Sequence, residues 1–296
     1  MPHSQEVAIT TLLEKLVPNL TITELQVLHF GKESQVAIVN QTRVFKFPRM
    51  SFTLEHYQTE STALPILQKF FTLQLPKKVG EYGDSKDHDS YCVEFELMKG
   101  IPLTRDTIEH LSPEEKKILG QEMGTFLADL HAVPVDILPT LPKPDQISYY
   151  GEELQKLQET CFPHLSKNAQ DTITSMYTTF FTQTQLFPPN NTIIHYDFGH
   201  DHVYVEGGHM VGVLDWGMVR LGDPALDFRW RDGPRSFDND IFTEALKTYR
   251  KRHPIDIAFL ERLEFYNTKK PLNHLLRAMK YQENVSDAIA RVEAIL

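Results

Sequence analysis

The stretch HYDFGHDH at residues 195–202 places three histidines and two aspartates within eight positions. It is followed by VYVEGGHMVGVLDWG at 203–217, in which two runs of strand-forming residues flank the turn sequence EGGH. This pattern predicts a β-hairpin. The polar stretch lies directly before the hairpin, and Asp215 lies at its exit. The sequence therefore predicts that the hairpin brings these polar side chains together.

Three residues of this region, Asp197, His202 and Asp215, suit a site for acid–base and metal chemistry. An aspartate in a loop can accept the proton of an attacking hydroxyl group. A carboxylate and a second side chain at the two ends of a hairpin can hold Mg²⁺, because phosphate groups of a substrate supply its other ligands. Protein kinases combine an H-R-D-x-x-x-x-N loop with a D-F-G metal motif in this way. The chain agrees with that arrangement: it has HxD at 195–197, His202 in the asparagine position and DWG at 215–217.

A lysine and a glutamate upstream extend the pattern in the same chain order. Residues 24–47 contain runs of β-branched and aromatic residues broken by GKES and NQT, which predict three short antiparallel strands. Lys46 lies in the third of these strands, between apolar residues. Glu60 follows in a segment with helical spacing at 54–70 and is placed to pair with Lys46. Together with HxD and DxG, this order forms a specific combination, although each part alone is weak.

The chain divides into two parts of different texture. Residues 1–98 combine an amphipathic helix (6–20), the three strands, a second helix and a hairpin with a polar tip at 83–90, which indicates a small, mostly antiparallel α+β unit. After residue 99 the chain is mostly helical, and Ser112 and Glu115 form a capping box at the start of one helix. We therefore expect an α+β fold with two lobes, a β-rich N-terminal lobe at 1–98 and a larger helical lobe at 99–296 that contains the hairpin.

The composition argues against several other classes of protein. The 296 residues are 41% hydrophobic and 24% charged, as in ordinary globular proteins. A formal charge of −10 argues against nucleic acid as the partner, since binding to a phosphate backbone needs clustered lysine and arginine. No apolar run approaches about 18 residues, so we expect no membrane span. Two isolated cysteines, Cys92 and Cys161, and an N-terminus without a signal-peptide pattern favour a cytoplasmic protein, which we expect to be a monomer.

Three longer stretches show a family resemblance. FLADLHAVP at 126–134, HYDFGHDHVYV at 195–205 and GVLDWGMVRLGDPALDF at 212–228 resemble the signatures of the aminoglycoside phosphotransferases, which share the protein-kinase-like fold. Within this family, His202, KFPR at 46–49 and MKGIPL at 98–103 together are most similar to the 2″-phosphotransferase branch. They are also somewhat similar to macrolide phosphotransferases. The similarity spans residues 25–230, and the remaining C-terminal segment matches in helical texture only.

This resemblance implies a role for each residue of the pattern. Asp197 would be the catalytic base, and His202 and Asp215 would hold Mg²⁺. Lys46 would contact the phosphates of the nucleotide, and Glu60 would position Lys46.

The resemblance also implies ATP or GTP as the phosphate donor. Ser34 and Gly31, in the single-glycine stretch GKESQVAI, are candidates for phosphate contact. The purine would be read near Phe95 and Met98, where backbone groups of the family usually bind it.

Residues around the proposed base differ from the family pattern in part. Asp223 and Asp227 in GDPALDF match it and would brace the catalytic loop. Relatives often have H-N-D-F-S-S-D-H where this chain has HYDFGHDH. Tyr196 therefore puts a bulky group next to the proposed base, and Gly199 and His200 replace two serine hydroxyl groups.

The acceptor of the phosphate is predicted to be a hydroxyl group of a small molecule, first of all an aminoglycoside antibiotic, as in a resistance kinase. Aminoglycosides are polycations, so their site should offer carboxylates, and Asp232 and Asp238 are candidates. These aspartates are interleaved with Arg229, Arg231 and Arg235, and the segment at 267–280 is basic. A less cationic alcohol, a macrolide or a metabolite, therefore remains open.

Two other functions are compatible with parts of the sequence. HDH at 200–202 could belong to a metal-dependent phosphohydrolase, but such sites take ligands from several separated segments, and the sequence offers no convincing set. A kinase-like binding module without activity would have lost the base or the metal aspartate, and this chain has both Asp197 and Asp215. Phosphotransfer is the function that accounts for all the motifs.

Overall fold

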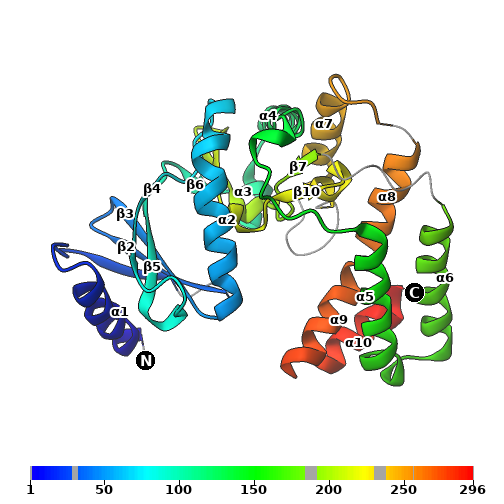
Figure 1. Cartoon of the computed structure of the whole chain (residues 1–296). Coiled ribbons are helices and arrows are strands. Elements are labelled where there is room, and N and C mark those ends of the chain that lie inside the picture. The colour runs from blue at the N-terminus through cyan, green and yellow to red at the C-terminus, as the bar shows by residue number, and fades with distance from the viewer. Residues whose placement is uncertain (1, 29–32, 184–191, 230–237, 256, 296) are drawn as a thin grey trace.

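The computed structural model describes residues 2–28, 33–183, 192–229, 238–255 and 257–295. Its N-terminal part is a five-stranded antiparallel sheet with the strand order β1-β2-β3-β5-β4. The strands are β1 (Leu25–Leu28), β2 (Ser34–Val39), β3 (Arg43–Pro48), β4 (Lys78–Gly83) and β5 (Tyr91–Glu96). Helix α1 (Pro2–Leu16) packs on one face of the sheet, and α2 (Ser51–Leu67) lies between the sheet and the rest of the chain (Figure 1).

The alternation of side chains along β3 decides which face of the sheet carries Lys46. Phe45 and Phe47 are buried against α1 in a cluster with Leu13 and Cys92. Successive side chains of a strand point to opposite faces. Lys46 therefore lies on the other face, toward α2.

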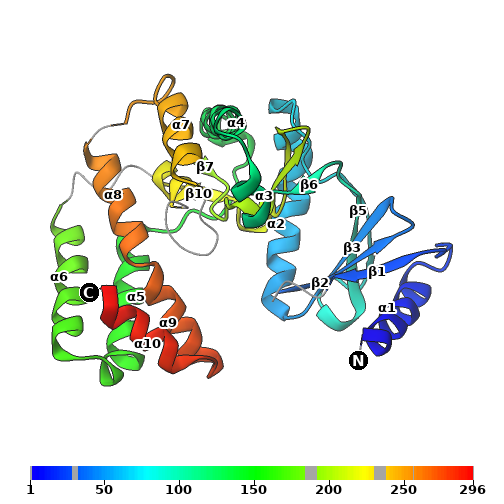
Figure 2. The same ribbon diagram turned by 180° about the vertical axis from the view of Figure 1, so that it is seen from behind.

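The C-terminal part consists mainly of helices. They are α3 (Arg105–His110), α4 (Pro113–His131), α5 (Gln146–Thr160), α6 (Lys167–Thr182), α7 (Asn239–Tyr249), α8 (Ile257–Thr268), α9 (Lys270–Tyr281) and α10 (Val285–Ile295). Helices α4 and α7 lie side by side, whereas α5, α6, α9 and α10 form a second group at the end far from the sheet (Figures 1 and 2).

Helix α4 begins and packs as its sequence predicts. The Ser112 hydroxyl accepts a hydrogen bond from the Glu115 backbone, and the Glu115 carboxylate accepts one from the Ser112 backbone, which forms the predicted capping box. Gly120 and Gly124, one turn apart, let the backbone of α7 come close. A Cβ atom on Gly124 would lie 2.3 Å from the carbonyl oxygen of Ala245, so a larger residue here would push the two helices apart.

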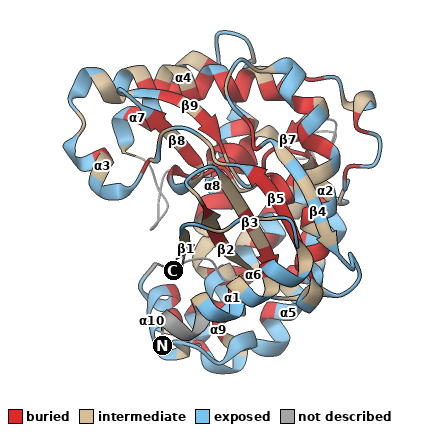
Figure 3. Cartoon of the chain, turned by 90° about the vertical axis from the view of Figure 1, so that its left-hand side faces the viewer, coloured by how far each residue is buried: buried red, intermediate tan, exposed pale blue. Residues whose placement is uncertain are grey.

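The predicted hairpin is present and belongs to a small sheet of its own. Strands β8 (Val203–Glu206) and β9 (His209–Val213) pair antiparallel, and β6 (Ile101–Pro102) adds to β8. Gly207 and Gly208 at the turn both have positive φ, as a tight type I′ turn requires. A second pair, β7 (Thr192–Ile194) with β10 (Arg220–Gly222), holds the two sides of the hairpin region together. Much of β7, β8 and β9 is buried, whereas much of α1, α3 and α10 is exposed (Figure 3).

The predicted fold class is confirmed by the antiparallel N-terminal sheet and the helical C-terminal part. Strand β5 ends at Glu96 and β6 begins at Ile101, so the chain passes between the two parts at 97–100. We propose the division at residues 98 and 99 as the boundary of the two lobes. Every helix in the described ranges is too short or too polar to span a lipid bilayer.

Candidate active site

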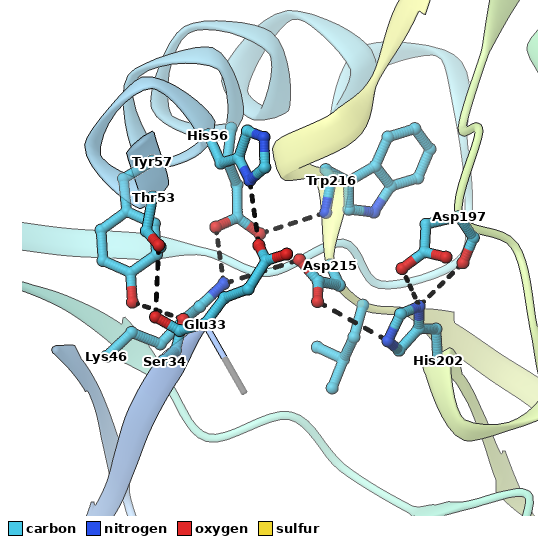
Figure 4. A network of polar contacts seen from close by, with 12 residues as sticks. Glu33, Ser34, Lys46, Thr53, His56, Tyr57, Asp197, His202, Asp215 and Trp216 are labelled. Atoms are coloured by element: carbon cyan, nitrogen blue, oxygen red, sulfur yellow. Dashed lines mark hydrogen bonds and ion pairs between the residues drawn. The ribbon is translucent and has the colours of Figure 1, made fainter. Parts of the chain in front are cut away.

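The side chain of His202 is oriented by the backbone of Asp197, in the loop at 195–202. Nδ1 of His202 lies 2.9 Å from the Asp197 carbonyl oxygen. A carbonyl oxygen can only accept, so Nδ1 carries the proton and Nε2 carries the lone pair in the neutral ring. Nε2 faces Asp215, whose Oδ2 is 3.6 Å away (Figure 4). One ligand atom from each of Asp197, His202 and Asp215 lies within 4.8 Å of the others. The predicted triad is therefore assembled.

The backbone of Asp215 is held in a position that only the surrounding structure can impose. Its φ of 62° lies in the left-handed region, which a non-glycine residue adopts at a cost of about 1 kcal/mol or more. Just before it, the Leu214 amide donates to the His202 carbonyl oxygen over 2.8 Å and closes the base of the hairpin. Just after it, the Trp216 amide donates to a Glu60 carboxylate oxygen over 3.2 Å. These two bonds fix Asp215 between the hairpin and α2.

Glu60 also holds the predicted strand lysine. Its other carboxylate oxygen lies 2.8 Å from Nζ of Lys46, and both side chains are largely buried. Asp215 lies between Lys46 and His202, with Oδ1 3.9 Å from the lysine Nζ (Figure 4). Burial alone would lower the pKa of Lys46, but the carboxylates of Glu60 and Asp215 raise it above its ordinary value. Lys46 is therefore a fixed positive charge beside the triad.

Asp227 braces the catalytic loop, as the resemblance implies. Its buried carboxylate accepts hydrogen bonds from the backbone amides of His195 over 2.8 Å and Tyr196 over 2.6 Å. The ring of His131 lies 3.1 Å from the same carboxylate. The bonds of Asp227 set the backbone directly before Asp197.

Asp223, expected to brace the same loop, instead binds helix α8. Its carboxylate accepts from the guanidinium of Arg262 over 2.6 Å and from the Tyr266 hydroxyl over 2.8 Å. All three side chains are buried. Asp223 therefore anchors the C-terminal helices to the turn after β10.

Tyr196 next to the proposed base forms a contact that the sequence did not reveal. Its φ of 69° is in the left-handed region, and two guanidinium groups lie against its ring. The guanidinium carbon of Arg220 is 3.8 Å from the ring centre, and that of Arg229 is 4.2 Å from it. Arg229 also donates to the Tyr196 carbonyl oxygen over 2.5 Å. The positions of Arg220 and Arg229 in the sequence do not indicate that they meet at one ring.

The predicted nucleotide contacts are placed as follows. The Ser34 hydroxyl accepts from Tyr57 over 2.8 Å, so its own proton remains to be donated to another acceptor. Phe95 pairs with strands on both sides, and its ring centre is 5.6 Å from Nζ of Lys46. Met98 follows the end of β5 and packs close to Gly212 of the hairpin. The backbone groups of Phe95 lie between two paired strands of the sheet. Met98, which follows the sheet, is therefore better placed to offer backbone groups to a purine.

The predicted substrate contacts receive no support from the described geometry. Asp238 caps α7 by accepting from the Asp240 amide, and it lies 2.9 Å from Nζ of Lys116 on α4. Asp232, like Gly31 of the nucleotide loop, lies outside the described residues.

Comparison with known proteins places the chain in a family. A model of the phosphotransferase enzyme family (APH) matches residues 24–253. The chain is 25% identical over 223 residues to the viomycin phosphotransferase of Streptomyces vinaceus, a match that covers 73% of this chain and 75% of that protein. It is 22% identical over 196 residues to the uncharacterized protein YcbJ of Bacillus subtilis (strain 168), covering 62% of this chain and 60% of that protein.

Solved structures with low sequence identity share the fold. The GDP and kanamycin complex of APH(2″)-IIIa has a TM-score of 0.87 at 19% identity, with 98% of each chain covered. The streptomycin–ATP–APH(2″)-IIa ternary complex has a TM-score of 0.74 at 20% identity, with 96% of each chain covered. The macrolide 2′-phosphotransferase MphH from Brachybacterium faecium has a TM-score of 0.71 at 20% identity, covering 98% of this chain and 97% of that one. The C-terminal helices, which matched in texture only, are thus part of the shared fold. The chain belongs to the phosphotransferase enzyme family and is a kinase-like phosphotransferase with the fold of the aminoglycoside 2″-phosphotransferases.

Proposed function

We propose that this enzyme transfers the γ-phosphate of ATP or GTP to a hydroxyl group of a small-molecule alcohol, with Mg²⁺ as cofactor. The observation that carries this proposal is the position of Glu60. Its two carboxylate oxygens bind Lys46 on one side and the Trp216 backbone, next to Asp215, on the other. This connection links the proposed phosphate-binding lysine to the proposed metal ligand.

Asp197 is the proposed catalytic base. Its carboxylate takes the proton of the acceptor hydroxyl as the new bond from oxygen to the γ-phosphorus forms and the bond to the β-phosphate oxygen breaks. The Asp227 carboxylate holds the backbone before Asp197 by accepting hydrogen bonds from two backbone amides. The base is therefore positioned before the substrate binds. Lys46 binds the nucleotide phosphates with its fixed charge, and the Ser34 hydroxyl is placed to donate to them.

The donor atoms of His202 and Asp215 suit a divalent cation. Histidines that bind a metal through one ring nitrogen commonly donate the N–H of the other to a backbone carbonyl, and Nδ1 of His202 is placed to do so with the carbonyl of Asp197. Carboxylate oxygens are the ligands that Mg²⁺ prefers, and it usually keeps few protein ligands beside substrate phosphates. When bound, Mg²⁺ would neutralise charge that develops on the phosphates.

Two acceptor classes follow from different observations. The neighbouring structures with kanamycin and streptomycin support an aminoglycoside, and with it a role in antibiotic resistance. The arginine pair around Tyr196 supports a less cationic alcohol instead, such as a macrolide or a metabolite. GDP and ATP each occur in a neighbouring structure, so both donors are proposed. We propose that the enzyme is a monomer. The two cysteines are buried and form no disulfide, as suits a reducing cytoplasm.

A nucleotide-consumption screen tests the proposal. MgATP and MgGTP are each offered with aminoglycosides, macrolides and small alcohols, and Asp197→Asn serves as the inactive control. Phosphorylated product with one donor, absent in the control, is the expected result. The proposal fails if neither nucleotide raises the melting temperature and no acceptor is phosphorylated.

A further inference from the structure

The two guanidinium groups around Tyr196 have most of their hydrogen-bonding capacity unused. Within the described residues, Arg220 donates through Nε to the Met218 carbonyl oxygen and Arg229 donates to the Tyr196 carbonyl oxygen. In the described part of the chain, no carboxylate lies within ion-pair distance of either group, although the charge of Asp197 acts on Arg229. A guanidinium has about five N–H donors in a planar fork that matches a carboxylate or a phosphate. The two groups beside this ring are therefore a cationic pair with N–H donors that no described residue binds.

A hollow of about 20 Å³ beside Arg220 is lined by no acidic side chain of the described residues. It is lined by Tyr149 and Tyr150 of α5, by Tyr196 and by Arg220, together with smaller polar and apolar residues. The Tyr149 hydroxyl lies 3.5 Å from that of Tyr196, which brings α5 against the catalytic loop. A polycationic substrate would meet no carboxylate on this wall.

The nearby glutamate of α5 is already neutralised. Both carboxylate oxygens of Glu153 lie 2.8 Å from Nζ of Lys269, and the Tyr177 hydroxyl donates to the same carboxylate. Both charged side chains are buried. Glu153 therefore cannot attract a substrate ammonium group without first losing Lys269 and leaving that charge unpaired in the interior.

The two guanidinium groups also act on the Tyr196 hydroxyl. Burial would raise the pKa of Tyr196, but the neighbouring guanidinium groups of Arg229 and Arg220 lower it to about 8. The same charges that favour a phenolate would favour an anionic group of a ligand.

A second hollow, of about 260 Å³, has a similar character. It lies between Met50 and Phe52 at the start of α2 and Arg277 and Lys280 at the end of α9. Its one lining carboxylate, Glu33, is paired with His56 over 3.2 Å. The face of α9 that meets the N-terminal lobe therefore also offers cations.

We propose that Arg220 and Arg229 form an acceptor subsite for a carboxylate or a phosphate group, so that the physiological acceptor is an anionic alcohol. This inference rests on the proposed function. Tyr196 precedes Asp197 in the chain, so an anion held by the two arginines would bring the rest of the acceptor, and its hydroxyl group, to the proposed base. Both guanidinium groups lie against the Tyr196 ring, and they repel a polycation.

Matched pairs of acceptors test the charge preference. D-Glycerate and glycerol 3-phosphate are compared with glycerol, and pantothenate is compared with its uncharged alcohol panthenol; kanamycin is the polycation. Within a pair, we expect kcat/KM to be higher by about tenfold or more for the anionic member. The carboxylate and phosphate arms identify which anion the subsite takes. A preference for kanamycin, or equal rates within every pair, would overturn the inference while leaving the proposed phosphotransfer intact.

If no acceptor of the panel is phosphorylated, a binding experiment tests whether the proposed subsite takes an anion. Enzyme saturated with MgADP, so that the nucleotide site is filled, is titrated with inorganic phosphate or succinate against sodium chloride of equal ionic strength. Wild type should show a saturable rise in melting temperature, and Arg220→Gln should lose it. Arg252→Gln, which makes the same charge change at a surface residue paired with Asp129, is the matched control and should behave as wild type. Equal shifts in all three proteins contradict the subsite.

A conservative variant covers the case in which Arg220→Gln fails to fold. Arg220→Lys keeps the charge but lacks the planar fork, so we expect the apparent affinity for phosphate or succinate to weaken by about threefold to tenfold. An unchanged affinity in Arg220→Lys together with an unchanged preference in the acceptor pairs would show that Arg220 only packs against Tyr196.

Discussion

Nε2 of His202 lies 3.6 Å from Oδ2 of Asp215, and both atoms carry lone pairs when the imidazole is neutral. The Asp197 carbonyl holds the only proton of that neutral ring on Nδ1. Two electron-rich atoms that face one another are stabilised by a cation bound to both. The relationship between His202 and Asp215 is therefore the part of the site most sensitive to a metal ion, and the first prediction concerns it.

Changing His202 should alter the Mg²⁺ requirement rather than the fold. His202→Ala removes one donor atom, so we expect the Mg²⁺ concentration for half-maximal transfer to rise by about tenfold. His202→Asn restores an oxygen ligand, which Mg²⁺ prefers, and should retain measurable activity. Transfer rate against Mg²⁺ concentration is measured for all three proteins. Identical curves for wild type and His202→Ala would mean that His202 only packs the loop.

Substitutions of Asp215 and of Asp197 should have different effects on nucleotide binding and on phosphate transfer. Asp215→Ala removes the proposed metal ligand, so we expect the melting-temperature rise with Mg²⁺ and nucleotide to disappear. Asp197→Ala should keep that rise, because the acceptor base does not hold the nucleotide, yet transfer should fall by about 100-fold or more. Thermal shift and turnover are measured on the same preparations. Near-native turnover of Asp197→Ala would refute the assignment of the base.

Glu60 should act by positioning Lys46 and the DWG backbone. Glu60→Gln keeps an acceptor for the Trp216 amide but removes the charge that holds Lys46. We expect kcat to fall by about 100-fold with a smaller change in KM for the nucleotide, because misplaced phosphates react slowly. Glu55→Gln, an exposed residue of the same helix, is the control. Equal kcat values for Glu60→Gln and the control would contradict this role.

The sequence predicted the parts of the site that follow from local pattern. Alternation along 43–48 determines the face of Lys46, and a helix that follows the strand brings Glu60 to that face. The EGGH turn likewise fixes the hairpin, and the hairpin fixes the separation of His202 from Asp215. Each of these distances depends on a few residues that are close together in the chain. The order of the motifs was therefore sufficient to predict which side chains meet.

The remaining contacts depend on packing between distant segments. Arg220 follows the hairpin and Arg229 follows a short 3₁₀ turn, and both reach Tyr196 only because β10 pairs with β7. Asp223 was expected at the loop and binds Arg262 of α8 instead, since that arginine would otherwise be buried without a partner charge. Sequence spacing does not predict contacts between such distant residues. The acceptor site was therefore harder to predict than the nucleotide site.

Asp227 should be important for stability as well as for activity. Asp227→Asn weakens two hydrogen bonds that the buried side chain accepts from backbone amides. We therefore expect the free energy of unfolding to fall by about 2 kcal/mol. Turnover should fall further than stability alone explains, because the same amides set the backbone before Asp197. Urea unfolding and turnover well below the melting temperature separate the two effects. Normal turnover in the folded variant would show that the loop keeps its shape without this carboxylate.

Burial of His195 should make the stability of the protein depend on pH. The side chain of His195 is fully buried, and its Nε2 donates to the Leu214 carbonyl oxygen over 2.9 Å. Within the described residues, Nδ1 has no hydrogen-bond partner. Burial lowers the pKa of His195, although the carboxylate of Asp227 acts in the opposite direction. An unfolded chain binds a proton at this residue below about pH 6.5, whereas the folded chain resists it. Its contribution to stability is therefore complete above that pH and is lost as the pH falls below it.

His195→Gln, which keeps a donor for Leu214, should flatten this dependence. We expect the slope of unfolding free energy against pH, measured with urea between about pH 5 and 7, to decrease by up to about 1.4 kcal/mol per pH unit. His110→Gln is the opposite control, because a backbone hydrogen bond to Asp106 raises the pKa of that exposed histidine and its removal should not flatten the slope. Equal slopes for wild type and His195→Gln would mean that the buried ring accepts a proton as readily as an unfolded one, and that the packing around the catalytic loop admits a charge.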